Sequence, residues 1–331
     1  MRVYDLDEIE KKLKNIPDRN IQFLKPDSLK QELSIITNQF ETGIEGKGCI
    51  EALFLFPGIF LTFFTFRASS ISVRHHAFPS LLQITFCHRG RLGWTLDHDG
   101  HIYLGPGDMS VHRMDTCTDS ILNLPFGYYE GITLFISPQN FKTSPPGFLQ
   151  EAGITDIKWL EKFCIGKEYA TFPGDGKIRN IFSVIYDSPE HLRDSYCKLK
   201  VLELFLYLST LSDSHVQNVS SCPPDQAEVI KQIHDYLLQN LGKRITIEEL
   251  SKRYLINTST LKDVFKSVYG GSIAAHMKEH RLEEGARLLL ETNDSIAQIA
   301  KKVGYESQSK FSLAFKEMFH VLPTEYRKKR K

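Results

Sequence analysis

The sequence predicts an α+β protein with a β-rich amino-terminal domain and an all-helical carboxy-terminal domain. Residues 49–136 contain short strand-like runs separated by turn signals, whereas apolar residues recur with a helical period after residue 227. The intervening segment 213–226 is rich in Ser, Asn and Pro and poor in large apolar side chains, which is typical of a linker. We therefore expect domains at 1–212 and 227–331, a division that suits a chain of 331 residues.

The composition excludes several classes of protein. Hydrophobic residues make up 41% and charged residues 24% of the chain, so it is neither disordered nor collagen-like. The apolar run at 52–66 is too interrupted to span a membrane, and the charged amino terminus lacks the apolar core of a signal peptide. The 6 cysteines form no C-x-x-C pair, so they indicate neither a disulfide framework nor a zinc site. We expect a cytoplasmic protein that does not contact a membrane.

Charge is distributed unevenly between the two halves. Residues 226–331 contain 19 Lys and Arg against 13 Asp and Glu, a net charge of +6, while residues 1–225 carry −5. A basic module beside an acidic body favours a polyanionic partner for that module. A basic surface that is merely solvated would give the same balance.

The β-rich region reads as a barrel or a sandwich. Its strand-like runs are rich in Phe, Ile, Thr and Val and are closed by turns. Asp99-Gly100 predicts a hairpin turn, and residues 105–108 (GPGD) predict a second tight turn.

A leucine-rich helix is predicted at 190–211. Its leucines fall on most of its faces, at Leu192, Leu199, Leu202, Leu204, Leu206, Leu208 and Leu211. Such a helix must be buried, either against the sheet of its own domain or against a second subunit. The sequence leaves both open, so a homodimer is one expected assembly.

The carboxy-terminal domain contains an internal repeat with an offset near fifty residues, 245–271 and 294–320. Each copy predicts a short capped helix, a turn and an amphipathic helix, with Thr246 and Glu249 forming a capping box in the first copy. Helix, turn and amphipathic helix are typical of a helix-turn-helix motif, and two in tandem within a basic domain favour a DNA reader. We place the motifs at about 246–269 and 295–319.

The outward faces of the two second helices supply the expected DNA contacts. Short polar side chains reach base edges, and lysines reach phosphates. The expected set is Thr258, Ser259, Lys262, Asp263, Lys266, Gln308, Ser309, Lys310, Ser312, Leu313 and Lys316.

One helix connects the motifs. Residues 272–292 predict a helix of about 30 Å, close to the spacing of about 34 Å between successive major grooves. The sequence therefore predicts that the motifs read two successive grooves; a plain helical bundle with solvated outer faces is the alternative.

The last hundred residues resemble the AraC/XylS family of transcriptional regulators. The match lies in IAQIAKKVGYESQSKFSLAFKEMFHVLPTEYR, at Ile296, Ile299, Ala300, Val303, Gly304, Tyr305, Ser307, Ser309, Phe311, Ala314, Phe315, Lys316, Phe319, Pro323, Tyr326 and Arg327. The connecting helix resembles that of the family through Arg281, Ala286 and Leu289. The resemblance implies a domain of seven helices, with recognition helices at about 258–269 and 307–319. It also implies double-stranded DNA and RNA polymerase as partners. An activator is the expected role, and the sequence leaves a repressor open.

Two positions depart from the family pattern. Leu313 stands where the family often has Arg, so a bidentate guanine contact is replaced by an apolar one. His320 stands where the family often has Gly before the Pro turn. The sequence pattern of the recognition helices is most similar to that of the siderophore-responsive branch of the family.

The β-rich domain resembles the cupin-like sensor half of the same family, which implies a cupin-like β-barrel that binds a small-molecule effector. A barrel of about eight strands can hold one small molecule. The candidate effector residues are Arg74, Phe86, His88, Trp94 and Tyr103. Any of the aromatic residues could instead pack the core.

An enzyme is the alternative class, because cupin enzymes bind metals through histidines and a carboxylate. The candidate ligands are His75, His76, His88, His98, His101 and His112, but no H-x-H motif with a following Glu is present. Cys87 in Cys-His-Arg invites comparison with alkyl-transfer cysteines, yet it lies in a strand-like run where a buried thiol is ordinary. We expect no enzymatic activity, no metal and no cofactor.

Overall fold

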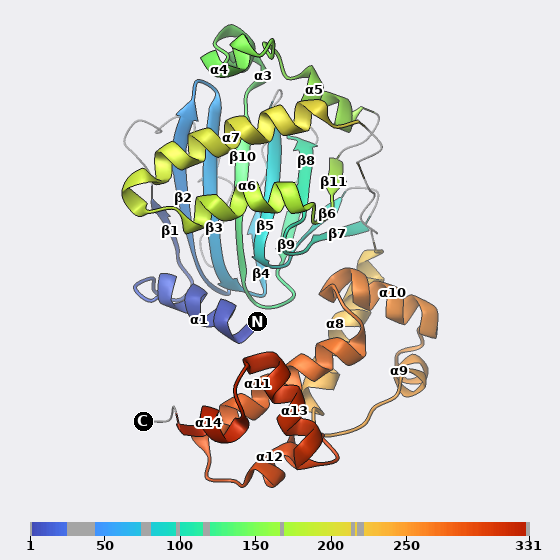
Figure 1. Cartoon of the computed structure of the whole chain (residues 1–331). Helices are drawn as coiled ribbons and strands as arrows, with labels where there is room; N and C mark the ends of the chain where they lie inside the picture. The colour runs from blue at the N-terminus through green and yellow to red at the C-terminus, as the bar shows by residue number, and fades with distance from the viewer. Residues whose placement is uncertain are drawn as a thin grey trace. The chain divides into compact units, whose positions relative to one another are not determined.

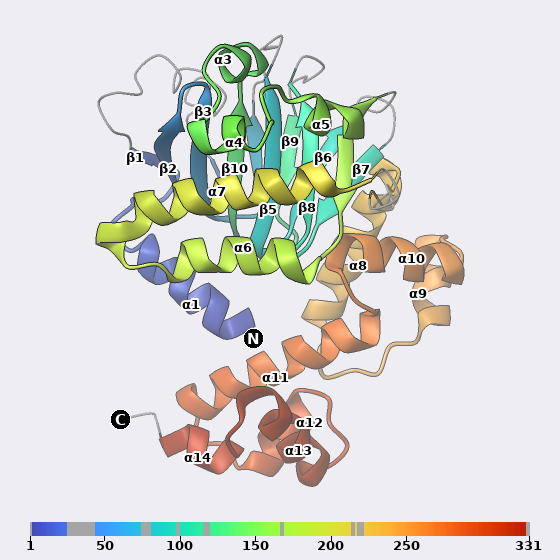
Figure 2. The same ribbon diagram turned by 45° about the horizontal axis from the view of Figure 1, so that its top comes forward.

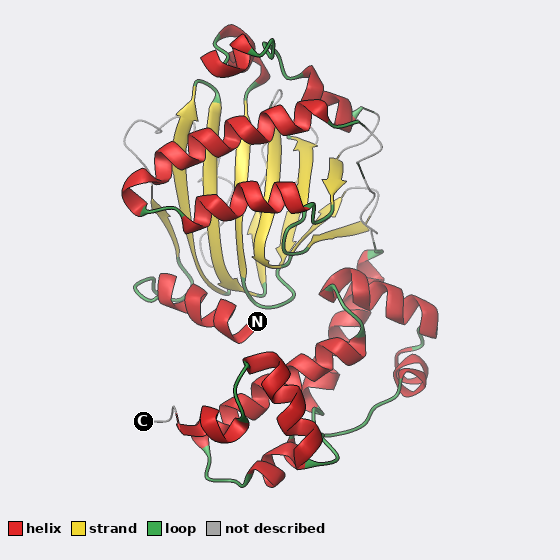
Figure 3. Cartoon of the chain, viewed as in Figure 1, coloured by secondary structure: helices red, strands yellow, loops and turns green. Residues whose placement is uncertain are grey.

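The computed structural model describes residues 2–24, 44–73, 81–96, 100–114, 120–165, 169–212, 216 and 222–328. The chain divides into two compact units, one spanning Asp5–Ser221 and one containing Cys222–Lys331. The first is built around sheets and the second is helical, so the predicted α+β class is confirmed (Figure 3). Within these ranges no helix has the length and apolar character needed to cross a bilayer.

Two sheets form the amino-terminal unit. The large sheet has the order β1-β2-β3-β10-β5-β8-β11 and the small one β4-β9-β6-β7; β1 pairs with β2 in parallel. The strands are β1 (Ile21–Leu24), β2 (Gly46–Phe56), β3 (Ile59–Ala68), β4 (Ser70–Val73), β5 (Leu82–Gly90), β6 (Leu92–Leu96), β7 (Gly100–Leu104), β8 (Met109–Arg113), β9 (Ser120–Asn123), β10 (Tyr129–Ile136) and β11 (Tyr169–Phe172).

The large sheet is buried on both faces. Because successive side chains alternate between faces, Ile84 and Phe86 of β5 join the cluster under the helices, while Cys87 joins the cluster between the two sheets. Helices α6 (Gly176–Asp187) and α7 (Arg193–Thr210) lie across the outer face of the sheet (Figures 1 and 2). Further helices among the described residues before Cys222 are α1 (Arg2–Lys12), α3 (Pro138–Thr143), α4 (Gly147–Glu151) and α5 (Lys158–Glu161).

Of the two predicted tight turns, one lies wholly within the described residues and the other only in part. At 105–108, the Gly105 N–H donates to the Asp108 carboxylate and the Asp108 N–H donates to the Gly105 carbonyl, so this turn is confirmed. At the predicted hairpin, Asp99 lies outside the described residues, and Gly100 opens β7 with φ of 87°.

The leucine-rich segment packs on its own domain. A 3₁₀ turn at Glu190–Leu192 precedes α7, whose buried side chains Cys197, Val201, Leu204, Phe205 and Leu208 belong to the cluster under the helices. Leu199 is 59% exposed on the opposite side. The sheet of the same domain therefore accounts for most of the apolar surface of α7.

The carboxy-terminal unit contains both predicted helix-turn-helix pairs. Its helices are α8 (Pro224–Gln239), α9 (Ile247–Tyr254), α10 (Thr258–Tyr269), α11 (Ile273–Glu291), α12 (Ile296–Lys302), α13 (Gln308–Phe319) and α14 (Pro323–Arg327). Helix α8 begins at Pro224, three residues earlier than the predicted start at 227, because proline suits the first helical position. Pro223, the residue before the helix, has φ of −55° and ψ of 142° and so lies outside it.

Local capping explains where the motif helices begin. The Thr246 hydroxyl accepts from the Glu249 N–H, and the Glu249 carboxylate accepts from the Thr246 N–H, as the sequence predicted. Ser295 and Gln298 form the same reciprocal pair at α12. The turns then require left-handed backbone, at Leu255 (φ 53°) in the first motif and Gly304 (φ 84°) in the second.

His320 ends α13 in the left-handed region, with φ of 59°. The turn that glycine would favour is therefore retained with a histidine. We expect His320→Val to lower the free energy of unfolding of this unit by about 1–2 kcal/mol, because a branched side chain is strained there. His320→Gly should leave it unchanged or raise it. Urea denaturation of both variants is the measurement, and equal stabilities would contradict the backbone assignment.

Candidate nucleic-acid interface

Helix α10 has one buried face and one exposed face. Leu261, Val264, Phe265 and Val268 are buried at helical spacing. The predicted contact residues lie opposite: Ser259, Lys262, Asp263 and Lys266 are exposed and Thr258 is half-buried. Asn257 caps the helix through the Thr260 N–H, so the exposed face begins at the first turn. This face can offer hydroxyl and ammonium donors to a nucleic acid.

Helix α13 repeats this arrangement. Phe311, Ala314, Phe315 and Phe319 are buried, and the exposed side chains are Gln308, Ser309, Lys310, Leu313 and Lys316, with Ser312 half-buried. Leu313 is 64% exposed, so its side chain is accessible for the apolar base contact that the sequence predicted. Both helices therefore present the predicted residues to solvent.

Some exposed charged side chains of α10 and α13 have an ion-pair or hydrogen-bond partner, and others take part in no salt bridge. Lys310 Nζ lies 2.5 Å from Glu306, and this pair holds the pKa of the Glu306 carboxyl below its ordinary value. Ser259 donates to Asp263 at 3.4 Å. Across the described ranges, Lys262, Lys266 and Lys316 take part in no salt bridge. These three lysines can contact phosphates without first leaving a partner.

Helix α11 links the two motifs. Its 19 residues give a length of about 28 Å, and Figure 2 shows it running from the α8–α10 helices to the α12–α14 helices. Arg281 donates to the carbonyls of Leu241 and Lys243 at 2.9 Å, which fastens the loop after α8 to α11. At Gly285 an added Cβ would lie 2.8 Å from the Phe311 ring, so glycine is what allows α13 to pack so closely.

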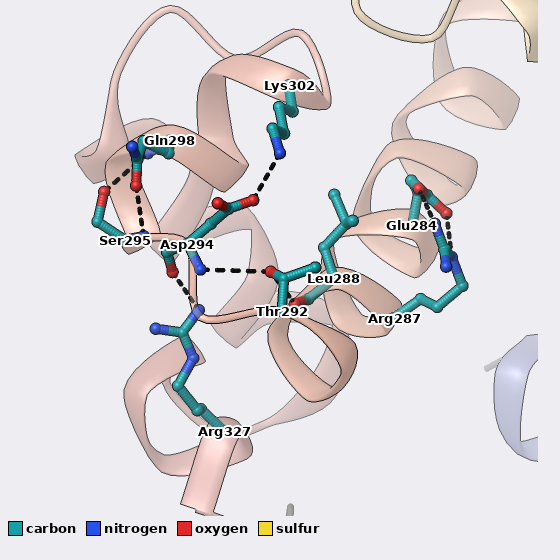
Figure 4. A network of polar contacts seen from close by, with 9 residues as sticks. All are labelled: Glu284, Arg287, Leu288, Thr292, Asp294, Ser295, Gln298, Lys302 and Arg327. Atoms are coloured by element: carbon teal, nitrogen blue, oxygen red, sulfur yellow. Dashed lines mark hydrogen bonds and ion pairs between the residues drawn. The ribbon is translucent and has the colours of Figure 1, made fainter.

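Arg327 fastens the second motif from the other end. Its Nη2 donates to the Asp294 carbonyl at 2.6 Å, between α11 and α12 (Figure 4). The Asp294 carboxylate accepts from Lys302 at 2.6 Å, and its N–H donates to Thr292. Arg327, which matched the family signature, therefore has a structural role, because it holds the segment between α11 and α12.

The predicted effector residues are not brought together. Phe86 stacks on Phe182 of α6 with ring centroids 4.2 Å apart, and His88 stacks on Tyr186 at 3.7 Å, so both lie on the helix side of the large sheet. Trp94 packs against the cluster between the sheets. Tyr103 is buried over Gly93, on the other face of the small sheet. Arg74 lies outside the described residues.

Two titratable groups of β5, His88 and Cys87, are neutral at pH 7. Burial, reinforced by Arg89 and Lys12, lowers the pKa of His88 to about 4, so it is no cationic anchor at neutral pH. Cys87 is fully buried, and burial raises the pKa of its thiol well above the ordinary value. A reactive thiol needs an accessible, electropositive site. Cys87 therefore fits the alternative of a buried small side chain.

Three histidines outside the predicted metal candidates come together in the carboxy-terminal unit. They are His234 of α8 and His276 and His280 of α11, with ligand atoms within 4.8 Å of one another. The sequence carries a signal for two of them, because His276 and His280 stand four residues apart on a predicted helix. His234 is 42 residues before His276 and has no such signal.

Comparison with known proteins places the helical unit. A family model described as a helix-turn-helix domain matches residues 250–329. The HTH-type transcriptional regulator AlkR of Acinetobacter baylyi is 31% identical over 121 residues, which are 37% of this chain and 38% of AlkR. The multiple antibiotic resistance protein MarA of Escherichia coli is 32% identical over 101 residues, 30% of this chain and 80% of MarA. The chain thus spans well under half of AlkR but most of MarA.

Among solved structures, ToxT from Vibrio cholerae is 12% identical with a TM-score of 0.34, covering 82% of this chain and 97% of that chain. The resemblance of the recognition helices to a siderophore-responsive branch stays a prediction.

The Arg327 network supports a prediction on stability. We expect Arg327→Ala to lower the free energy of unfolding of the carboxy-terminal unit by about 2–3 kcal/mol, because backbone carbonyls lose a charged donor. Arg327→Lys should restore less than half of it, because an ammonium does not reproduce the guanidinium fork. Arg287→Ala is the matched control: Arg287 pairs on the surface with Glu284 and Glu291 of its own helix, so about 0.5 kcal/mol is expected. Equal losses in urea denaturation would contradict the role of Arg327.

His88 predicts how stability depends on pH. Its pKa is about 4 in the folded state against 6.5 ordinarily, so between these values the unfolded chain binds more protons. The amino-terminal unit should therefore lose up to about 3 kcal/mol of stability as the pH falls from 6.5 to 4. His88→Phe keeps a ring against Tyr186 and should remove that part of the loss. Urea denaturation at pH 7 and 4.5 is the measurement; the same pH dependence in both proteins would rule out His88 as its source.

Proposed function

Because the chain belongs to the AraC/XylS family of transcriptional regulators, we propose that it regulates transcription by placing α10 and α13 in two successive major grooves of double-stranded DNA. The observation that carries this proposal is the pair of exposed polar helix faces held by one helix. Successive grooves lie about 34 Å apart, and α11 is close to that length. The residues proposed to contact DNA are Thr258, Ser259, Lys262, Asp263, Lys266, Gln308, Ser309, Lys310, Ser312, Leu313 and Lys316.

We further propose that the reader is a domain of seven helices at 227–331, extended at its start by the first turn of α8. The amino-terminal domain, 1–212, is proposed to be a cupin-like sensor of a small-molecule effector, joined to the reader by the linker at 213–226. Since the described effector candidates lie on different surfaces, they do not define the effector site. Activation through RNA polymerase and action in the cytoplasm complete the proposal.

A homodimer is proposed through the outer side of α7. Leu199 there is 59% exposed, and Leu192 just before the helix is 41% exposed. Leu199, on a helix that already covers its own sheet, and Leu192 before it are the residues proposed to contact a second copy.

The alternative of a metal-dependent cupin enzyme gains no support from the described part of the amino-terminal unit. His88 stacks on Tyr186, His101 lies near Tyr103, and His112 lies near Trp94. His75, His76 and His98 lie outside the described residues. We therefore propose a regulator without catalytic residues.

Two substitutions in α13 test the DNA proposal. On a site selected from a random DNA pool, Gln308→Ala should cost about 1–3 kcal/mol of binding free energy and relax the preference at one base position. Lys316→Ala should weaken binding to all sequences alike and reduce the slope of log affinity against log salt by about 0.9. Lys158→Ala is the control, because Lys158 is an exposed lysine of the amino-terminal unit.

Binding measured across salt concentrations and across single-base variants of the site separates these effects. If Gln308→Ala keeps the full sequence preference, α13 does not read bases through this face. If Lys158→Ala and Lys316→Ala change the salt slope equally, the phosphate contact is not local to α13.

A further inference from the structure

The three histidines of the carboxy-terminal unit are arranged as a metal-ligand set. His276 and His280 lie one turn apart on the same face of α11, and their Nε2 atoms are 3.1 Å apart. His234 of α8 brings its nitrogen within 4.8 Å of both. Two ligands at 2.0–2.1 Å from a tetrahedral Zn²⁺ ion would be about 3.3 Å apart. The pair on α11 is therefore at ligand spacing already, and the nitrogen of His234, within 4.8 Å of that pair, completes a set of three imidazoles.

Two of the three imidazole rings have a carboxylate close to the Nδ1 atom. The Nδ1 atom of His280 lies 3.4 Å from Glu283, and the Nδ1 atom of His234 lies 3.4 Å from Asp235. A metal-bound imidazole commonly donates its other N–H to a carboxylate, which orients the ring and makes its ligating nitrogen more basic. In His280 this arrangement turns Nε2 toward His276.

The surroundings are those of a partly enclosed site. His234 is 7% exposed and His276 is 2% exposed, while His280 is half-buried at the edge. Tyr269 stacks on His234 at 4.3 Å, and Phe265 packs edge-on against His276 at 5.4 Å. Neutral imidazoles are suited to Zn²⁺, Ni²⁺, Cu²⁺ and Fe²⁺ rather than to Mg²⁺ or Ca²⁺.

The internal repeat shows that packing alone does not require histidine here. With the offset of fifty, His276 takes the place that Tyr326 takes in the second motif. Tyr326 packs on Phe315 and Phe319 at 5.3 and 5.4 Å, as His276 packs on Phe265 and Tyr269 at 5.4 and 4.8 Å. A phenol ring fills this position in one copy. In the other copy it is an imidazole, with two more imidazoles beside it.

We propose that His234, His276 and His280 bind one divalent transition-metal ion of the Zn²⁺ class, with the fourth position taken by water. Because Phe265 and Tyr269 belong to α10, an ion at this site fastens α8 and α11 together beneath the first recognition helix. The site goes beyond the proposed regulation of transcription, and it is tested on the protein without DNA, so its failure leaves the DNA proposal untouched.

The test is a titration of the tag-free full-length chain, stripped with a chelator, with Co²⁺ followed by visible absorption and with Zn²⁺ followed by calorimetry. We expect saturation at one equivalent, with a tetrahedral Co²⁺ spectrum that Zn²⁺ abolishes. His280→Gln should lose this step, because the half-buried ligand is removed with little change in packing. Glu283→Gln should weaken it by about 10–100-fold. His191→Gln is the control, because His191 is exposed and lies in the other unit.

Thermal unfolding adds a second readout. Zn²⁺ should raise the midpoint of the wild-type chain and of His191→Gln but not that of His280→Gln, since an ion that binds only the folded state stabilises it. The proposal is overturned if no saturable one-equivalent step is found, or if His280→Gln binds as the wild type does. Should His280→Gln fail to fold, X-ray absorption of the Zn²⁺-loaded wild type decides: three imidazole nitrogens at about 2.0–2.1 Å support the site, and a shell without them overturns it.

Discussion

The helix α11 is the element on which the reader depends. Its first half packs on α8 and α10 and its second half on α12, α13 and α14. An α-helix of this length is stiff, so the distance between the motifs follows from the number of residues between them. Arg281 hydrogen-bonds the loop after α8 to this helix, and Gly285 leaves room for the Phe311 ring. The distance between the motifs, the Arg281 hydrogen bonds and the glycine that allows close packing therefore all belong to α11.

The two motifs could be predicted from sequence because their determinants are local. The capping pair at Thr246 and Glu249 spans three residues, and the buried stripe from Leu261 to Val268 spans two turns. The internal repeat shows the same pattern a second time, which strengthens the prediction of both motifs. The start of α8 was misplaced by three residues because proline is typical both of a linker and of the first helical turn.

The amino-terminal candidates could not be predicted in the same way. Strand β5 is buried on both faces, so its sequence lacks the polar–apolar alternation that would separate them. The sequence consequently predicts Phe86 to face the inside of a barrel, whereas in the structure it packs against Phe182 of α6. The arrangement of His88 depends on Tyr186, which is almost a hundred residues away and has no local signature. Contacts of this kind follow from topology and not from spacing.

The two halves of the reader differ in what holds them together. Around α13 the core is apolar, built from Phe311, Phe315 and Phe319 with Tyr326, and it needs no polar partner. Around α10 the corresponding place holds imidazoles whose outer nitrogens face carboxylates. An ion that binds only the folded state stabilises it. The imidazole nitrogens offer atoms to which such an ion can bind, whereas the apolar core around α13 offers none. An ion at the histidines would therefore act on the first motif and leave the second unchanged, while α11 keeps the distance between them.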